Sequence, residues 1–559
     1  MAHESFESEE VAAIMNREFV NIKVDREERP DVDRVYMTFV QATTGHGGWP
    51  MSVWLTPSLQ PFVGGTYFPP DDRYGQPGFG KLLERIAEAW KENQDKITEQ
   101  GAKIVEALKE SQASPLVSTE TLDSDVLEKA FQQFSSTFDA QEGGFGNAPK
   151  FPRPVTLNFL MRFYARELAQ VSNLPDEKNA TLKVAPQSER ALKMDLITLR
   201  KMAAGGMHDQ LAGGFHRYSV DRFWHVPHFE KMLYDQAQLA IAYLEAFQIS
   251  GDVQFADVAR DVLDYVSREM TAKDGGFFSA EDADSLVPAA AVFDPPKDEF
   301  AAANSGTDSS KLDDVSTDAR RTPLPKSEHA EGAFYVWTKI EIDAALADDA
   351  EIFNFHYGVE PNGNAPAGSD PQDEFRGKNI LIQRHTVDET AKHFNQSANE
   401  IEKSLTASRA KLFSIRAQRP RPHLDDKILA GWNGLMISAF ARGAQVLNES
   451  RYLERAIRAA AFLQTHLYDE SNKVLFRSYR EGRGEVEGFA DDYAFVIQAM
   501  LDLYEASFDT EWLKFATELQ ETQNKLFWED EQGGYLSTRG HDKIVVLRMK
   551  DDNDGAETS

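Results

Sequence analysis

The spacing of apolar residues divides the chain into two parts. Residues 19–25 alternate between apolar and polar, as in a half-buried strand, and further strand patterns follow Pro50 and cover residues 61–68. A helical stretch lies between the first two of these, and an amphipathic helical pattern runs over residues 79–111. This order predicts an α/β domain over residues 1–112.

Beyond a polar link, residues 120–559 show helical spacing almost throughout. Predicted helices end at a Gly-Gly-aromatic turn, which recurs at residues 143–145, 213–215, 275–277 and 533–535. Glycine supplies the left-handed cap, and the ring packs back on the helices. Repeats of roughly 60 to 70 residues are long for a solenoid. They indicate an all-α ring of helical hairpins, an (α/α)6 toroid, which we expect to be incomplete at its C-terminal end.

One stretch interrupts the helical pattern. Residues from about 286 to 327 are rich in Ala, Asp, Ser, Pro and Thr and have little periodicity. Such a composition cannot bury enough apolar surface to offset the entropy lost on ordering. We therefore expect a disordered insertion within the toroid.

A Trp-Pro bond within a Gly-rich turn marks the predicted α/β domain. In Gly47-Gly48-Trp49-Pro50 the proline precedes an apolar strand pattern. X-Pro is the peptide bond that adopts the cis form at modest cost, so Pro50 is a cis-proline candidate like the one opposite the redox site of thioredoxin folds. An ordinary trans proline at a strand start fits the segment equally well.

These motifs carry a family resemblance. His3-Glu4-Ser5-Phe6, the run from Lys23 to Asp33, and Gly47-Gly48-Trp49-Pro50 resemble the spermatogenesis-associated protein 20 family. The resemblance implies a thioredoxin-like domain joined to a barrel similar to six-hairpin glycosidases and N-acylglucosamine 2-epimerases, and a role in fertility. Family members carry a His-Trp-Cys-His stretch just upstream of this chain's start, so the resemblance also implies that the first strand and the cysteine region are missing. Dithiol chemistry needs a thiolate, and a chain with 0 Cys has none.

Composition narrows the range of partners. A net charge of −31 argues against nucleic acid and against anionic membranes, which both select basic surfaces. No apolar run approaches the roughly 18 residues of a membrane span, and no signal-peptide core opens the chain. We expect a soluble protein, cytoplasmic rather than targeted elsewhere, and the sequence predicts neither a cofactor nor a metal.

Residues that could catalyse a reaction or bind a ligand cluster just before the predicted helices. The first cluster contains Trp224, His225 and His228, followed by Tyr234 and Asp235. Imidazoles and carboxylates this close in sequence can converge on one ligand. Histidines that only cap and pack the loop are the alternative interpretation.

Two further clusters follow Gly-rich turns. Glu281, Asp282 and Asp284 would repel one another unless they bind a cation or a hydroxylated ligand, and a solvated acidic loop is the alternative. Trp432 and Asn433 lie at a helix start, where the ring could stack on a sugar or simply pack against the next hairpin.

A fourth cluster is formed by Asp491, Asp492 and Tyr493. An N-cap explains one of the two carboxylates. Because the clusters occupy equivalent places in successive hairpins, a toroid would gather them around one funnel.

Paired carboxylates beside aromatic rings suit sugar chemistry, since one acid protonates or deprotonates the substrate while another stabilises charge or activates water. The leading hypothesis is a carbohydrate-active or sugar-binding protein, either epimerase-like or glycosidase-like, with a small carbohydrate as ligand. Its predicted acid–base groups are Asp235, Glu281, Asp282 and Asp491, assisted by His225 and His228, and its predicted substrate contacts are Trp224, Tyr234, Trp432, Asn433, Asp492 and Tyr493. One alternative is a thioredoxin-like redox or chaperone-type protein that binds a protein partner through its N-terminal domain. Another is a pseudoenzyme scaffold.

Overall fold

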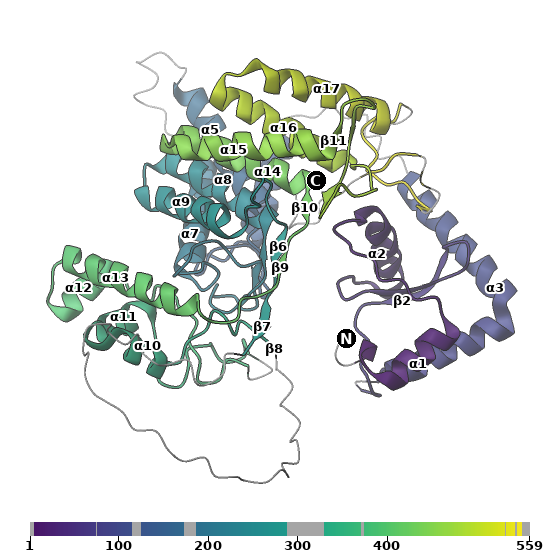
Figure 1. Ribbon diagram of the computed structural model, residues 1–559, viewed down its shortest axis with the longest axis horizontal. Coiled ribbons are helices and arrows are strands. Elements are labelled where there is room, and N and C mark those ends of the chain that lie inside the picture. Colours follow the sequence, from purple (N-terminus) through teal and green to yellow (C-terminus); the bar gives the residue numbers. More distant parts are fainter. Residues whose placement is uncertain are drawn as a thin grey trace, which may run out of the picture.

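The computed structural model describes residues 5–73, 75–113, 125–172, 186–287, 329–370, 374–530, 533–540, 542 and 545–550. Figure 1 shows a helical body, an α/β part beside it and a smaller group of helices at the lower left. The insertion expected at about 286–327 lies outside the described residues from residue 288 on. Its first residue, Leu286, is the last residue of a strand.

The α/β part packs helices against a two-stranded ribbon. Its elements are α1 (Glu9–Glu18), α2 (Pro30–Thr44), β1 (Ser52–Leu55), β2 (Pro61–Gly65) and α3 (Phe79–Ala113). Pro30 is the first residue of α2, where the backbone N–H that proline lacks would have no partner within the helix. Gly45 ends the helix in the left-handed conformation. β1 and β2 pair antiparallel, with Ser52 opposite Gly65. The predicted order of a helix, two strands and a long helix is confirmed, and the Trp49–Pro50 bond is cis.

The strand expected over residues 19–25 is not formed. Val20 is 91% exposed and Ile22 is 74% exposed. Among the described residues, this part of the chain has only the β1–β2 pair, so no neighbouring strand covers the segment. The prediction of a half-buried strand is therefore wrong. Alternation becomes a strand only where a sheet edge offers hydrogen-bond partners.

Helical hairpins build the body. The inner helices are α5 (Pro154–Ser172), α8 (Leu233–Ser250), α14 (Ala430–Leu447) and α16 (Ala490–Ser507). Around them lie α4 (Asp125–Thr137), α7 (Pro186–Ala204), α9 (Val253–Glu269), α15 (Ser450–Phe462) with the π-helical turn η3 (Leu463–Leu467), and α17 (Thr510–Phe527). The inner helices pack side by side in chain order, and each packs against the outer helix that follows it. Most of the residues of α8 and α14 are buried, as expected for helices that are apolar almost all round.

The Gly-Gly-aromatic turns recur as predicted. The N–H of Asp139 donates to the carbonyl of Gly144, and that of Asp209 donates to Gly214, both at 3.0 Å. The N–H of Glu529 likewise donates to the carbonyl of Gly534, at 2.9 Å. The first two of these turns return the chain from α4 to α5 and from α7 toward α8.

Short antiparallel strands connect the hairpins. The pairs are β3 (Tyr218–Ser219) with β4 (Pro227–His228), β7 (Asp284–Leu286) with β8 (His329–Glu331), β10 (Ile428–Leu429) with β13 (Ser478–Tyr479), and β11 (Tyr468–Asp469) with β12 (Val474–Leu475). A sheet in the order β5 (Lys231–Met232), β6 (Ala280–Glu281) and β9 (Leu424–Asp425) lies among them. Between β8 and β9, an inserted helical group with its own core contains α10 (Lys339–Leu346), η2 (Ala347–Asp349), α11 (Ala350–Tyr357), α12 (Val387–Phe394) and α13 (Ala398–Arg416).

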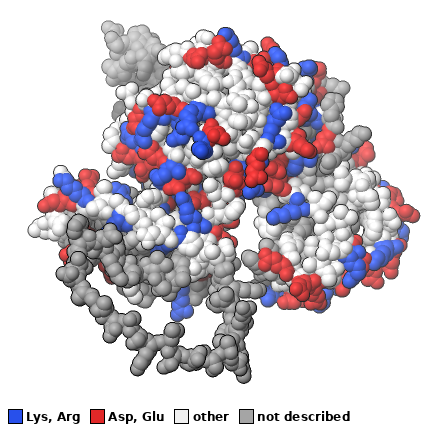
Figure 2. Space-filling view, viewed as in Figure 1, with Lys and Arg blue, Asp and Glu red and all other residues white. Residues whose placement is uncertain are grey.

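A charged contact joins the α/β part to the helical body. Lys427 Nζ lies 2.6 Å from Asp25 Oδ2 and 2.9 Å from Glu27 Oε2. Arg477 Nε donates to the carbonyl of Glu27 at 2.8 Å. On the face shown in Figure 2, Lys and Arg side chains lie among the Asp and Glu side chains. In the part of the chain that the structure describes, no helix is both long and apolar enough to cross a membrane.

Candidate functional site

The first turns of α8, α14 and α16 lie in series. Tyr234 of α8 and Trp432 of α14 meet edge to face, with ring centroids 4.9 Å apart. The N–H of Gly431 in α14 donates to Asp492 Oδ1 of α16 at 2.9 Å. Helix N-termini carry unsatisfied N–H groups and partial positive charge, so they suit acceptors and carboxylates. The structure therefore brings three of the predicted clusters to one region.

Asp235 follows Tyr234 in the first turn of α8 and is 2% exposed. Arg217 is its nearby cation. Burial opposes the charge of Arg217, but Tyr234, Glu230 and Asp235 around it raise its pKa above the usual value. Arg217 Nη1 donates to Glu230 Oε2 at 2.7 Å. A buried carboxylate, a guanidinium and two aromatic rings thus lie together at the starts of α8 and α14.

The two carboxylates of α16 differ in role. Asp492 is fully buried and accepts hydrogen bonds from Gly431, from the N–H of Phe489 and from Arg477, each at 2.9 Å. Burial raises the pKa of Asp492 to about 6, although Arg477 opposes this shift. Asp492 therefore ties α16 to α14. Asp491 lies 3.6 Å from Arg477 with 16% of its side chain exposed, which leaves it the more accessible of the two.

Two of the predicted substrate contacts bind the backbone. Asn433 accepts from the N–H of Phe277 at 2.8 Å and donates to the carbonyls of Phe277 and Leu429. The hydroxyl of Tyr493 accepts from the N–H of Leu475 at 2.9 Å. These side chains hold the turns that precede the inner helices.

Gln236 binds the backbone of the corresponding turn one hairpin earlier in the chain. The sequence alone did not lead us to this residue. Its amide accepts from the N–H of Phe215 at 2.8 Å and donates to the carbonyl of Phe215 at 2.7 Å. Gln236 and Asn433 are the fourth residues of α8 and α14, and each pairs with the aromatic residue of a Gly-Gly-Phe turn. That shared offset was a signal available in the sequence.

Trp224, His225 and His228 have other partners. Trp224 is fully buried and its Nε1 donates to the carbonyl of Glu142 at 2.9 Å. His225 is buried, and burial lowers its pKa, although Asp221 opposes this. The structure therefore places these two rings in packing positions within the loop before β4.

His228 belongs to an ion-pair chain. Its Nδ1 lies 2.6 Å from Glu331 Oε1, and its Nε2 lies 3.6 Å from Glu230 Oε2. Burial opposes its charged form, but the carboxylates of Glu230 and Glu331 raise the pKa of His228 to about 9. Through Glu230 and Arg217 this chain reaches the surroundings of Asp235.

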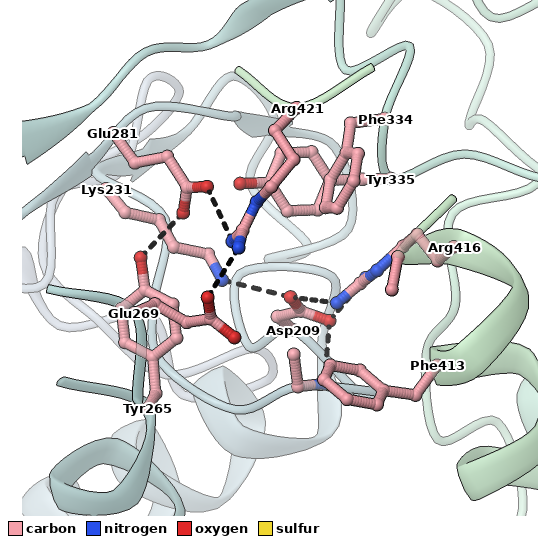
Figure 3. A pocket seen from close by; sticks show the side chains of 12 residues that line it. Asp209, Lys231, Tyr265, Glu269, Glu281, Phe334, Tyr335, Phe413, Arg416 and Arg421 are labelled. Carbon is pink, nitrogen blue, oxygen red and sulfur yellow. Dashed lines mark hydrogen bonds and ion pairs between the residues drawn. The ribbon is translucent and has the colours of Figure 1, made fainter. Parts of the chain in front are cut away.

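Glu281 lies apart from the first turns of α8, α14 and α16, in a cavity between the helical body and the inserted helices (Figure 3). Its Oε2 accepts from the hydroxyl of Tyr265 at 2.8 Å, and its Oε1 lies 3.2 Å from Arg421. The cavity measures about 50 Å³ and is lined by Asp209, Ala212, Lys231, Tyr265, Glu269, Glu281, Phe334, Tyr335, Phe413, Arg416, Ala417 and Arg421. Asp282, the next residue, is exposed.

Sequence reasoning missed the charged centre of this cavity. Arg416 binds Asp209 in a bidentate pair with both distances 2.8 Å, and Lys231 Nζ lies 2.9 Å from the same carboxylate. Burial alone would raise the pKa of Asp209, but Arg416 and Lys231 hold it well below its usual range. The run of arginines at 416, 419 and 421 was the available signal. Among the described residues, no group of three His, Asp or Glu is placed to hold a metal ion.

A family model described as "Protein of unknown function, DUF255", of the thioredoxin DsbH type, matches residues 1–109. Spermatogenesis-associated protein 20 of Homo sapiens is 42% identical over 586 residues, which cover 100% of this chain and 67% of the human protein. The protein of the same name from Mus musculus is 42% identical with the same coverage, and an uncharacterized protein of Caenorhabditis elegans is 39% identical over 100% of this chain and 71% of its own length.

Two solved structures are similar at low identity. A sugar epimerase from a ruminal bacterium matches at 13% identity with a TM-score of 0.28, covering 74% of this chain and 89% of its own. A family 76 glycoside hydrolase (mannosidase) of Bacteroides thetaiotaomicron matches at 8% identity with a TM-score of 0.37, covering 72% of each chain.

Proposed function

This chain belongs to the spermatogenesis-associated protein 20 family, and we propose that its helical body binds a carbohydrate at the first turns of α8, α14 and α16. The observation that carries the proposal is the contact between Tyr234 and Trp432, two aromatic residues from separate inner helices. The buried Asp235 lies in the same first turn of α8 as Tyr234. Aromatic rings bind the apolar C–H faces of sugars, and carboxylates accept hydrogen bonds from sugar hydroxyls.

In this proposal the aromatic pair forms the floor of the site. Tyr234 and Trp432 are each 3% exposed, so both residues are almost fully buried. The more accessible polar groups around the floor are Arg217 and Glu230, with 21% and 24% of their side chains exposed, and Asp491 on the neighbouring helix. They supply donors and acceptors to hydroxyl groups, as a few placed polar groups do in small-molecule sites.

Asp235 is the proposed acid–base group. A carboxyl group that is buried and close to one guanidinium can hold or release a proton according to what binds beside it. Asp491, in the first turn of α16, is the proposed second carboxylate. A pair of this kind would serve either hydrolysis of a glycosidic bond or proton transfer at a sugar carbon.

Binding of mono- and oligosaccharides to the whole chain tests the proposal. We expect at least one saccharide to bind measurably by calorimetry after a glycan-array screen. Asp235→Asn and Trp432→Phe should each weaken that binding at least tenfold, and Asp235→Asn should abolish any turnover seen by NMR. The matched controls are Asp257→Asn, whose side chain is 71% exposed, and Trp90→Phe, which lies in α3 of the α/β part and stacks on Phe62.

The proposal fails if no saccharide binds, or if the two site variants bind like their controls. Far-UV and near-UV circular dichroism of each variant separates loss of binding from loss of fold.

A further inference from the structure

The first turn of α14 is capped by other parts of the chain. Its N-cap residue, Leu429, makes no side-chain cap hydrogen bond, so the N–H groups of Ala430 and Gly431 need acceptors from elsewhere. The carbonyl of Arg477 accepts from Ala430 at 2.8 Å, and Asp492 Oδ1 accepts from Gly431 at 2.9 Å. Because Trp432 is the next residue of α14, its placement depends on Arg477 and Asp492.

Arg477 also binds the α/β part. Its guanidinium donates from Nη1 to Asp492 Oδ1 at 2.9 Å and from Nε to the carbonyl of Glu27 at 2.8 Å, and 3% of the side chain is exposed. Nη1 lies 3.6 Å from Asp491 as well. The donors of a guanidinium have a fixed planar arrangement, so two bonds set its orientation. The turn over residues 25–29 therefore helps to orient the side chain that holds both carboxylates at the start of α16.

A second connection reaches α16 through the C-terminal segment. The N–H of Ala490, the first residue of α16, donates to the carbonyl of Ser537 at 3.1 Å, and the N–H of Ser537 donates to the carbonyl of Met549 at 2.8 Å. Met549 and Leu547 are buried in one apolar cluster with residues of α2. In Figure 1 this yellow segment lies between α17 and the α/β part. The starts of both inner helices are thus bonded to residues that contact the α/β part.

Ion pairs hold the turn over residues 25–29 against the helical body. Lys427, with 6% of its side chain exposed, lies 2.6 Å from Asp25 Oδ2 and 2.9 Å from Glu27 Oε2. A third carboxylate that it meets, Asp425 at 2.9 Å, belongs to the body itself. If the turn moved away, Lys427 would keep only Asp425 of these three, and a buried ammonium is costly unless it is well paired. The body is therefore most stable with the turn in place.

We propose that binding of the α/β part to the helical body orders the first turns of α14 and α16, so that this part controls the carbohydrate site without contributing a residue to it. When the contact opens, Arg477 loses the carbonyl of Glu27, and the acceptors of the α14 N–H groups are no longer fixed. Helix ends open locally when the groups that cap them can move, and such opening displaces Trp432 and Asp491. The consequence for saccharide binding rests on the proposed function, whereas the ordering of the helix starts does not.

Hydrogen exchange of the whole chain, followed by mass spectrometry, tests the proposal. Asp25→Asn combined with Glu27→Gln removes both charges that hold the turn and leaves every residue of the helical body unchanged. We expect exchange to become roughly tenfold faster in peptides covering residues 428–436 and 488–496, and to stay the same in the last turns of α14 and α16. The affinity for a saccharide that binds the wild type should fall about fivefold. If the double variant does not fold, Asp25→Asn alone, at a side chain that is 43% exposed, should speed the same exchange roughly threefold.

Asp95→Asn combined with Glu99→Gln is the matched control, since it makes the same two chemical changes at exposed positions of α3 in the same part of the chain. It should leave exchange and affinity as in the wild type. Equal exchange in the interface variant and in this control would overturn the proposal, whether or not a saccharide binds. Faster exchange with unchanged saccharide affinity would also overturn it, because the helix starts would then open without effect on the site. A wild-type chain that binds no saccharide counts against the carbohydrate site, and the exchange comparison still decides whether the α/β part orders the helix starts.

Discussion

Lys427 of the helical body holds Glu27 of the thioredoxin-like domain at 2.9 Å, with only 6% of the lysine side chain exposed. The same ammonium meets Asp25 at 2.6 Å and Asp425 at 2.9 Å. Burial opposes the charge of Lys427, but these carboxylates raise its pKa. One cation therefore joins the Asp25-Arg26-Glu27 motif of the first domain to the turn between β9 and β10, close to the start of α14.

Removing this cation should loosen the contact between the domains. Lys427→Met leaves Asp25, Glu27 and Asp425 facing one another without their shared partner. Breaking a buried ion pair from one side costs up to about 3 kcal/mol where one of the carboxylates is partly exposed. We expect the free energy of unfolding in urea to fall by that order, with faster proteolysis of residues 19–29.

Lys103→Met is the control for this change. Lys103 pairs with Glu99 at 2.6 Å, but the two side chains are 73% and 68% exposed. Exposed pairs contribute roughly 0–1 kcal/mol, so this variant should be near neutral. Equal effects of the two substitutions would mean that the domains are held together by something other than Lys427.

The pairing of His228 with Glu230 and Glu331 should make stability depend on pH. Its pKa in the folded protein is about 9, above the value of about 6.5 in an unfolded chain. A raised pKa stabilises the fold fully below about pH 6.5, and this contribution is lost as pH rises through about 9. With 25% of the side chain exposed, we expect about 2 kcal/mol.

His228→Gln isolates this contribution. The difference in unfolding free energy between wild type and variant should be largest at pH 6 and should shrink by about 2 kcal/mol between pH 7 and pH 10. A difference that stays constant over this range would show that the histidine is not charged in the folded protein.

Local chemistry explains what the sequence could predict about the fold. The Gly-Gly-Phe turns need left-handed backbone, which glycine supplies whatever surrounds it, so their positions were readable. The strand expected over residues 19–25 depends on a neighbouring strand. Its alternation alone could not say whether that neighbour is present.

Strand pairing explains why two of the predicted site residues, Glu281 and Asp235, lie in different places. Lys231 and Glu281 are directly opposite each other on β5 and β6, so both side chains project from one face of that sheet toward Tyr265 of α9. Asp235 comes four residues after Lys231, in the first turn of α8. Arg416 comes from an inserted helix 207 residues after its partner Asp209, and no local pattern links two residues so far apart.

The amide of Asn433 offers a test of the turn that it holds. Asn433→Ala removes three hydrogen bonds and leaves the buried N–H and carbonyl of Phe277 without this partner. Each buried group left unsatisfied costs about 1–3 kcal/mol. We expect the free energy of unfolding to fall by about 3 kcal/mol, measured in urea. Asn524→Ala, on the exposed side of α17, should be neutral or slightly stabilising because alanine favours helices.

Close packing of α14 against α16 should make Gly434 sensitive to a single methyl group. A Cβ at Gly434 would lie 2.6 Å from the carbonyl carbon of Phe495 and 2.8 Å from the backbone nitrogen of Val496. Backbone cannot rotate aside as a side chain can, so Gly434→Ala must push the two helices apart. Overpacking of this kind costs about 1–3 kcal/mol, which exceeds the roughly 1 kcal/mol that alanine gains in helix propensity.

Gly443→Ala on the same helix separates the two effects. There the added Cβ would lie 2.6 Å from Cδ1 of Leu263, the flexible end of a side chain that can move away. We expect Gly434→Ala to lower the melting temperature by several degrees and Gly443→Ala to change it much less. Since α14 also carries Trp432, the first substitution should weaken any saccharide binding as well, while the second should leave it intact. If the two variants melt alike, then α16 has room to shift, and the close approach of the inner helices is not what positions Trp432.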